Sequence, residues 1–443
     1  METTHISQIS LNSHPRLGKK WPEALGDEAY HGLAGEVVRL IEPHSESDPI
    51  AVLTQLLVLY GSVIGRSAYF IAEADRHYLN LFSVLVGKTS KGRKGTSLGQ
   101  SKRFFESIDS EWALNRTQSG LSSGEGLIWA VRDEIRKKEP VKNKGRVVDY
   151  QEVIADEGVF DKRLLIVEAE FASTLRVLER DGNTLSALIR QAWDTGNLRS
   201  LTKNFPAKST DAHISIIAHI TRDELCRYMN RTEAGNGFGN RFLWVCVQRS
   251  KLLPEGGKLQ LVDYVPAVQK LSDSIKFART VGELKRDDEA KELWLKKYSS
   301  LSKEIPGLVG ALTARAEAQV MRLACIYALF DCSDVIRVEH LCAALTLWDY
   351  VEASVSYIFS DSFGDPEADT IIGALRSNPT GLSRTEISNL FGRHASPGQI
   401  PRALGVLQEL GLADKKNENT GGRPQEIWFA VAKEAKNAKE ENN

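Results

Sequence analysis

The sequence has few cysteines, and none stands in a pattern that predicts a bridge or a metal site. No two of them form a C-x-x-C pair, and their odd number argues against a disulfide framework. Cysteines that lie within apolar runs pack as small hydrophobic residues. The sequence therefore gives no reason to expect a structural zinc site. The five are Cys226, Cys246, Cys325, Cys332 and Cys342.

Two further features are missing: a long apolar run and an excess of charge of one sign. No apolar stretch is long enough to span a bilayer, and the polar N-terminus lacks the pattern of a signal peptide. The net charge is -1, so any nucleic acid must be bound by local basic patches. We expect a cytoplasmic protein without a membrane partner, with two or three domains in its 443 residues.

The most informative stretch is glycine-rich and basic. Residues 87–97 follow an apolar run, 81–86, that predicts a buried strand, and they precede a helix predicted over 98–105. This order of strand, glycine-rich turn, lysine, hydroxyl and helix is typical of a phosphate-binding loop. In such a loop, backbone N–H groups and the helix N-terminus surround phosphate oxygens. The sequence therefore predicts a site for ATP with Mg²⁺.

The spacing departs from the usual G-x-x-x-x-G-K-[ST] pattern. Arg93 separates Gly92 from Lys94, and Gly95 separates Lys94 from Thr96. We assign phosphate binding to Lys94 and Mg²⁺ ligation to Thr96, with Ser97 as the alternative hydroxyl. A basic, flexible surface loop is the competing interpretation. The predicted nucleotide-binding residues are Gly87, Gly92, Arg93, Lys94, Gly95, Thr96 and Ser97.

A second apolar run, 163–167, leads to two carboxylates, as in a Walker B strand. In open α/β sheets such groups emerge at the carboxyl edge, where ligands bind. We assign Glu168 to Mg²⁺ and Glu170 to activation of the attacking water. Glu125, at a turn before a predicted helix, is the second candidate for orienting this water. It could instead only favour the helix dipole.

Two more candidates lie at later strands. His219, in a third buried run, 213–221, is the candidate sensor of the γ-phosphate, with a satisfied core histidine as the equal alternative. Arg241 follows a flexible, glycine-rich turn and opens a strand over 242–247. It is the candidate arginine finger, supplied to a neighbouring subunit. Arg249, at the far end of that strand, is the second candidate for the finger. Arg315 and Arg322, on a predicted helix, could approach the nucleotide from a helical lid. An ordinary ion pair is the alternative for each of these arginines.

The predicted organisation is α/β. It comprises a helical lead-in (1–65), a RecA-like P-loop core (66–260), a helical region (261–360), a winged helix (361–432) and a disordered tail (433–443). The charge-rich stretch 134–162 predicts a solvated insertion or a mobile loop. The winged helix would place its third helix, 399–410, in a major groove of DNA. Protein contacts are the alternative. Its candidate DNA-binding residues are Arg393, Arg402, Lys415, Lys416 and Arg423.

Residues 21–360 resemble YfjI-type proteins, a domain of unknown function encoded on prophages, plasmids and other mobile elements. The resemblance implies a RecA-like ATPase similar to replicative helicases of the DnaB or Twinkle type. It also implies a homo-oligomeric ring, such as a hexamer, around single-stranded DNA. The motifs that carry it are Trp21-Pro22-Glu23, Ala29 to Gly35, Glu42-Pro43, Val86 to Ser97, Ser122 to Gly126 and Arg315 to Arg322.

We therefore expect an ATP-hydrolysing motor that acts on DNA, as a helicase or replication protein of a mobile element. One alternative is an ATP-dependent DNA-binding regulator or defence ATPase that does not unwind DNA. Another is an ATP-binding assembly scaffold.

Overall fold

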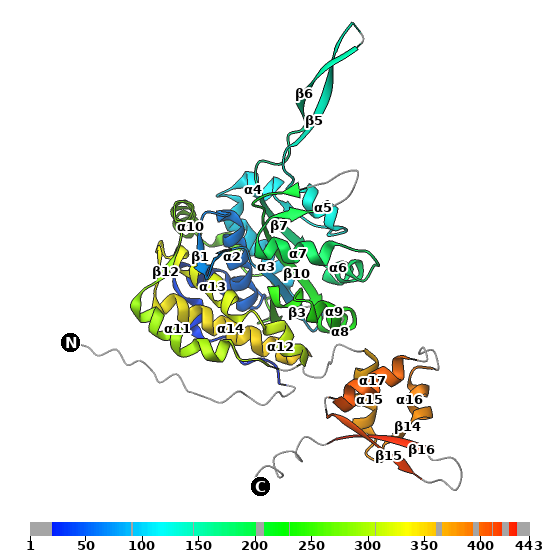
Figure 1. The fold of residues 1–443 in the computed structure, drawn as a ribbon. Coiled ribbons are helices and arrows are strands. Elements are labelled where there is room, and N and C mark those ends of the chain that lie inside the picture. The colour runs from blue at the N-terminus through cyan, green and yellow to red at the C-terminus, as the bar shows by residue number, and fades with distance from the viewer. Residues whose placement is uncertain are drawn as a thin grey trace, which may run out of the picture.

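The computed structural model describes most of the chain, as residues 20–89, 92–144, 146–200, 208–229, 231–305, 307–359, 366–392, 398–409, 411–418 and 425–431. Helices surround a central sheet, a long hairpin projects from it, and the C-terminal elements form a separate small unit (Figure 1). Within the described residues, no helix is long and apolar enough to cross a membrane.

A five-stranded parallel sheet lies at the centre of the molecule. Its strand order is β11-β3-β10-β7-β4, and each pair of neighbours is parallel. Three strands, β3, β10 and β11, are almost wholly buried, as expected for a parallel sheet covered on both faces. The predicted α/β class is therefore confirmed. The strands are β3 (Phe82–Gly87), β4 (Thr117–Gln118), β7 (Arg163–Glu168), β10 (His213–Thr221) and β11 (Phe242–Val247).

The strand order creates a switch point between β3 and β10. After β3 the chain crosses to β4 at one edge and returns through β7 and β10, whereas after β10 it passes to β11 on the far side of β3. Ligands of open α/β sheets bind at such a point, beyond the carboxyl ends of the strands. Gly87 and Thr221, the last residues of β3 and β10, are register partners. The switch point therefore coincides with the predicted phosphate loop.

The N-terminal helix α2 (Pro49–Ile64) covers part of the sheet, and α1 (Gly32–Ile41) packs on α2. Asp48-Pro49 opens α2, and the Asp48 carboxylate accepts a hydrogen bond from the Ile50 N–H. The helices that follow the sheet strands are α3 (Lys94–Glu106), α4 (Ser110–Asn115), α5 (Gly124–Trp129), α6 (Phe171–Leu178), α7 (Leu185–Asp194), α8 (Arg222–Tyr228) and α9 (Arg231–Gly235).

The long helical region shares one hydrophobic core with the sheet. At its centre α14 packs on β11, where the Tyr350 hydroxyl donates to the Cys246 carbonyl over 2.8 Å. The predicted lead-in belongs to the same core. These helices are α10 (Val265–Ala278), α11 (Asp288–Leu301), α12 (Gly307–Thr313), α13 (Ala316–Phe330) and α14 (Val338–Phe359).

Short elements connect these layers. The small two-stranded pairs are β1 (Tyr69–Ala72) with β2 (Asp75–Tyr78), β8 (Leu198–Arg199) with β9 (Lys208–Ser209), and β12 (Lys285–Arg286) with β13 (Val335–Ile336). The 3-10 turns are η1 (Asp27–Tyr30), η2 (Glu42–His44), η4 (Gly239–Arg241) and η5 (Leu259–Leu261).

The charge-rich insertion is a hairpin of two long strands, β5 (Ile135–Asn143) and β6 (Arg146–Asp156). Among the described residues, the two strands pair only with each other, and they extend away from the body (Figure 1). The prediction of a loop is therefore wrong for these residues, although most of them are exposed, as expected of a solvated insertion. Val, Ile and Tyr in β6 favour a strand, a signal that the charged neighbours obscured.

The C-terminal elements enclose a second, smaller core. Their sheet has the order β14-β16-β15 and is antiparallel. Ser383 caps a helix through a capping box with Glu386. Lys415 and Lys416 lie within a strand. The elements are α15 (Pro366–Ser377), β14 (Leu382–Ser383), α16 (Arg384–Leu390), α17 (Gln399–Glu409), β15 (Ala413–Glu418) and β16 (Gln425–Ala430).

Candidate functional site

The loop after β3 turns back over the end of its own strand. Arg93 adopts a left-handed conformation with φ of 54°, and α3 begins at the next residue, Lys94. The Lys94 ammonium donates to the Thr89 carbonyl over 3.3 Å. A Cβ on Gly87 would lie 2.9 Å from the Lys94 Nζ, so the ammonium lies directly against the last residue of β3. The Lys94 side chain therefore lies over the end of β3.

Lys94 is buried without a carboxylate partner. It is 8% exposed, and within the described residues its ammonium forms no ion pair. Burial lowers the pKa of Lys94, while the charge of Glu224 acts in the opposite direction. A buried ammonium is costly unless it is paired. The charge balance at this position therefore favours an anion from outside the chain.

The two candidate hydroxyls differ in what they contact. Ser97 is fully buried, and its hydroxyl donates to the Lys94 carbonyl over 2.7 Å. Thr96 is exposed on the first turn of α3, next to Gly95, whose surroundings are open. Because Ser97 is engaged within the helix, Thr96 is the hydroxyl that a ligand can reach.

His219 lies close to this loop and is linked to it by a residue that the sequence did not reveal. Burial, together with the charge of Lys94, lowers the pKa of His219 to about 4, so the ring is neutral at pH 7. The Gln55 amide donates to the His219 Nε2 over 3.1 Å and also contacts the Lys94 carbonyl at 3.5 Å. Gln55 therefore connects β10 to the start of α3. Its only signal in the sequence is a polar side chain within the apolar run of α2.

The two carboxylates that follow β7 have different surroundings. Glu168 is 7% exposed and accepts hydrogen bonds from the Gly120 and Leu121 N–H groups, over 2.7 and 2.8 Å. It thereby fixes the loop after β4. Glu170 is exposed at the start of α6 and does not cap that helix with its side chain.

The sheet register places the carboxylates at different depths. Glu168 lies opposite Ala218, three residues before Thr221, the partner of Gly87. Glu168 is therefore deeper in the sheet than the loop, and Glu170 is closer to its level. Assignment of Mg²⁺ to Glu168 and of the water to Glu170 stays a prediction.

Glu125 is exposed in the first turn of α5. Its carboxylate accepts hydrogen bonds from the hydroxyls of Thr184 and Ser200, over 3.3 and 3.5 Å. These contacts tie it to the segment before α7 and to residue 200 rather than to the loop after β3.

Arg241 lies at the opposite edge of the sheet from Lys94. It directly precedes β11, whose first residue, Phe242, is the partner of Phe82 at the start of β3. Its guanidinium pairs with the Asp194 carboxylate over 2.6 Å and also donates to the Gly237 carbonyl. Within one chain, Arg241 therefore cannot reach the loop. Its action on a neighbouring subunit stays a prediction.

The turn before Arg241 is part of the core. Phe238 is completely buried, and a Cβ on Gly239 would lie 2.2 Å from the Leu312 side chain. The prediction of a turn outside the core is therefore wrong for Phe238 and Gly239, because Gly239 allows close packing against α12.

Two further arginines at this edge are held by internal partners. Arg322 is fully buried, donates to the Asn80 and Trp193 carbonyls over 2.7 and 2.8 Å, and stacks on the Trp193 ring. Arg315 pairs with Asp194 at 3.6 Å. These internal contacts explain the positions of both arginines.

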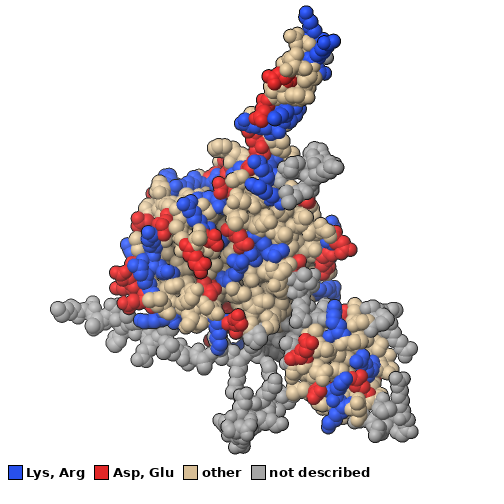
Figure 2. Space-filling view, in the orientation of Figure 1, with Lys and Arg blue, Asp and Glu red and all other residues tan. Residues whose placement is uncertain are grey.

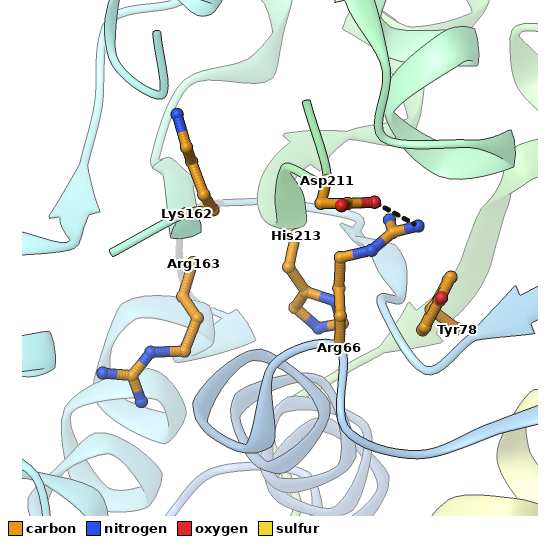
Figure 3. A pocket seen from close by; sticks show the side chains of 6 residues that line it. All are labelled: Arg66, Tyr78, Lys162, Arg163, Asp211 and His213. Carbon is orange, nitrogen blue, oxygen red and sulfur yellow. Dashed lines mark ion pairs between the residues drawn. The ribbon is translucent and has the colours of Figure 1, made fainter. Parts of the chain in front are cut away.

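A cavity of about 250 Å³ also lies at the amino edge (Figure 3). Within it Arg66 pairs with Asp211 at 3.5 Å and stacks on Tyr78. Lys162 and Arg163 point away from this pair (Figure 3), toward Asp133 and Asp161 respectively. The cations do not converge, so the cavity is not an anion site.

A cluster formed by His31, Asp331 and His340 contains residue types that bind metal ions. Its potential ligand atoms, however, already take part in hydrogen bonds. The His340 Nδ1 accepts the Arg337 N–H over 3.0 Å, which places the ring proton on Nε2. That Nε2 faces Asp331 at 3.4 Å. The cluster is therefore explained by hydrogen bonding.

The candidate DNA-binding residues are only partly free. Arg402 pairs with Glu367 at 3.2 Å, and Lys415 pairs with Glu426 at 2.8 Å. Lys416 is exposed. Arg393 and Arg423 lie outside the described residues.

No protein-family model and no curated protein matches this chain. The resemblance to YfjI-type proteins rests on the sequence motifs alone.

Proposed function

We propose that this chain is an ATPase with a RecA-like core, and that ATP binds beyond the carboxyl ends of β3 and β10. The observation that carries the proposal is Lys94. It is buried, lacks a carboxylate partner, lies over Gly87 and begins a 13-residue helix at the switch point of a parallel sheet. The other buried cations described above all have internal partners.

In this proposal the loop and α3 hold the phosphates. Lys94 exchanges the Thr89 carbonyl for phosphate oxygens, and the first N–H groups of α3 add the positive end of its dipole. The exposed Thr96 hydroxyl and the carboxylates after β7 are oxygen donors, which suit Mg²⁺. Bound Mg²⁺ would neutralise charge on the phosphates.

The remaining residues act on the attacking water and on the position of the loop after β3. Glu170, exposed near the level of the loop, accepts the proton of the attacking water. Glu168 holds the neighbouring loop in place and would help to hold Mg²⁺. Gln55 links His219 to Lys94, so a shift of α3 on phosphate binding is transmitted to β10.

The experiment is ATP turnover, with binding of a fluorescent ATP analogue measured in parallel. Lys94→Ala should remove turnover and weaken binding without loss of stability, because an unpaired buried ammonium contributes little to folding. Lys88→Ala is the matched control, since Lys88 loses the same charge from the same loop but is exposed. Turnover at the wild-type rate in Lys94→Ala contradicts the proposal, as does equal loss in both variants.

We further propose that the ATPase acts on DNA. The support is the C-terminal unit, in which three helices precede two paired strands, as a winged helix requires. Strand separation driven by ATP would distinguish a motor from a DNA-binding regulator. Stimulation of turnover by single-stranded DNA would distinguish either from an assembly scaffold.

The proposed motor is a homo-oligomer in which Arg241 leaves its ion pair with Asp194 and reaches a neighbour's ATP. Mixing Arg241→Lys and Lys94→Ala subunits tests this. A Lys94→Ala subunit cannot bind ATP productively, but its Arg241 can still reach the intact ATP site of a neighbouring Arg241→Lys subunit. Recovery of turnover in mixed oligomers supports the proposal. An active monomer contradicts it.

A further inference from the structure

The hairpin of β5 and β6, here called the arm, has no core behind it. In the part of the chain that the structure describes, its strands pair only with each other, and most of their side chains are exposed. An isolated two-stranded hairpin is at best marginally stable in water. Large apolar side chains nevertheless face solvent, among them Val148 (61% exposed), Tyr150 (62%) and Ile154 (55%). The arm therefore has the properties of a surface that a partner covers.

The charge of the arm indicates which partner. The arm as a whole carries six cations and four acids, but residues 140–148, around its turn, carry three cations and no acid, although the whole chain is almost neutral. Basic side chains gather toward the end of the arm in Figure 2. The cations are Arg136, Lys137, Lys138, Lys142, Lys144 and Arg146.

The cations nearest the end are not neutralised by the arm itself. Within the described residues, Arg136 pairs with Glu134, and Lys137 with Glu139. Lys142, Lys144 and Arg146 are exposed and form no ion pair there. Three unpaired cations beside the turn are complementary to a row of phosphates.

Strand register adds apolar contacts on one face. Pro140 lies opposite Tyr150, and Arg136 lies opposite Ile154, so alternate residues bring cations and apolar groups to the same face. A two-stranded ribbon fits the major groove of B-form DNA, whereas the major groove of A-form RNA is too narrow for side chains to read. The nine residues of β5 extend roughly 30 Å, enough to cross that groove.

We propose that the arm is a DNA-binding element that lies in the major groove of duplex DNA. Lys142, Lys144 and Arg146 contact phosphates, and Tyr150 and Ile154 pack against the groove wall. The proposed association with DNA motivates the choice of ligand, but the site is separate from the ATP site and from the C-terminal unit.

The test uses the full chain and a fluorescein-labelled DNA duplex of about 20 base pairs, with anisotropy measured from about 50 to 200 mM salt. Lys142→Gln, Lys144→Gln and Arg146→Gln are combined in one variant. We expect at least about tenfold weaker binding at low salt, and a slope of log affinity against log salt that falls by about 2 to 3. These side chains have no core contacts, so folding should be unchanged.

The matched control combines Lys285→Gln, Lys291→Gln and Lys296→Gln, which removes the same charge from exposed positions on β12 and α11. It should bind as the wild type does. Equal weakening in the control, or an unchanged slope in the arm variant, overturns the proposal. So does equal binding of an RNA duplex of the same sequence, or a change in oligomer size in place of DNA affinity.

ATP turnover without DNA is measured on the same samples. Absence of turnover in the wild type would refute the proposed ATPase but leave the DNA result intact, so the two failures are distinguishable.

Discussion

The two edges of the central sheet differ in how their charged side chains are paired. At the amino edge, Arg163 is held by Asp161 and Asp109, and Arg241 by Asp194. At the carboxyl edge, Arg93 is held by Glu46, but within the described residues neither the buried Lys94 nor the exposed Glu170 forms an ion pair. The amino edge therefore pairs its arginines internally, whereas the carboxyl edge also contains a lysine and a carboxylate without such a pair.

This difference separates structural from functional roles. A buried charge with its partner removed costs several kcal/mol, so internal pairs at the amino edge should report on stability. Charges without internal partners contribute little to folding and remain available to a ligand. Substitutions at the two edges should therefore affect different measurements.

The largest expected effect is at the carboxyl edge. Glu170→Gln should lower ATP turnover by about 10²- to 10⁴-fold, because an amide cannot accept the proton of the attacking water. Binding of ATP and the unfolding midpoint in urea should be unchanged, because Glu170 is exposed and does not cap α6 with its side chain. Single-turnover hydrolysis separates the chemical step from binding.

Glu125→Gln is the control, since it removes another exposed carboxylate from the start of a helix. Should Glu125→Gln lose turnover while Glu170→Gln keeps it, the roles of the two carboxylates are exchanged.

The second effect concerns the amino edge. Arg322→Met should destabilise the chain by about 3–5 kcal/mol, because it leaves the Asn80 and Trp193 carbonyls buried without a donor. Urea unfolding measures this loss. Burial lowers the pKa of Arg322 to about 9, but its hydrogen bonds keep the guanidinium in place.

Turnover per folded molecule should stay close to wild type in Arg322→Met. A variant that kept its stability but lost turnover would contradict the assignment of the amino edge to structure. Lys276→Met, at an exposed position on α10, controls for the loss of charge.

Much of this contrast could be predicted from local patterns. Apolar runs located β3, β7, β10 and β11, and the glycines and Lys94 located the switch point. These signals are local because a buried parallel strand is a continuous apolar run. They identified the carboxyl edge without any knowledge of the strand order.

The partners at each edge could not be predicted, since they come from distant parts of the chain. Asp194 lies 47 residues from Arg241, and Gln55 lies 164 residues from His219. Arg241 consequently had the sequence features of a free arginine but is buried in an ion pair. The arm was missed for a different reason, because its charged residues concealed a strand pattern.

The third effect tests the link between Gln55 and the loop. Gln55→Leu should remove the donor to His219 and the contact to the Lys94 carbonyl, at a cost of about 1 kcal/mol in stability. We expect turnover to fall more than binding, because the link coordinates β10 with α3. The control is Thr54→Val, the neighbouring buried polar residue on α2. Equal turnover in Gln55→Leu and the wild type would limit the residue to packing.

The smallest effect is expected from a satisfied cluster outside both edges. His31 donates to Asp331 over 2.8 Å, and this hydrogen bond raises the pKa of His31 above its usual 6.5. Burial alone would raise the pKa of Asp331, but hydrogen bonds from His31 and His340 outweigh it and lower that pKa. The unfolded chain binds fewer protons at His31, so its contribution is complete below pH 6.5 and is lost as pH rises through the folded pKa. The Asp331 contribution is instead lost as pH falls below about 4. Because both side chains are partly exposed, each effect should be about 1 kcal/mol. His31→Gln should therefore remove the decline in unfolding free energy between about pH 6 and 8, whereas His44→Gln should preserve it. A decline that persists unchanged in His31→Gln would show that the pair does not titrate with folding.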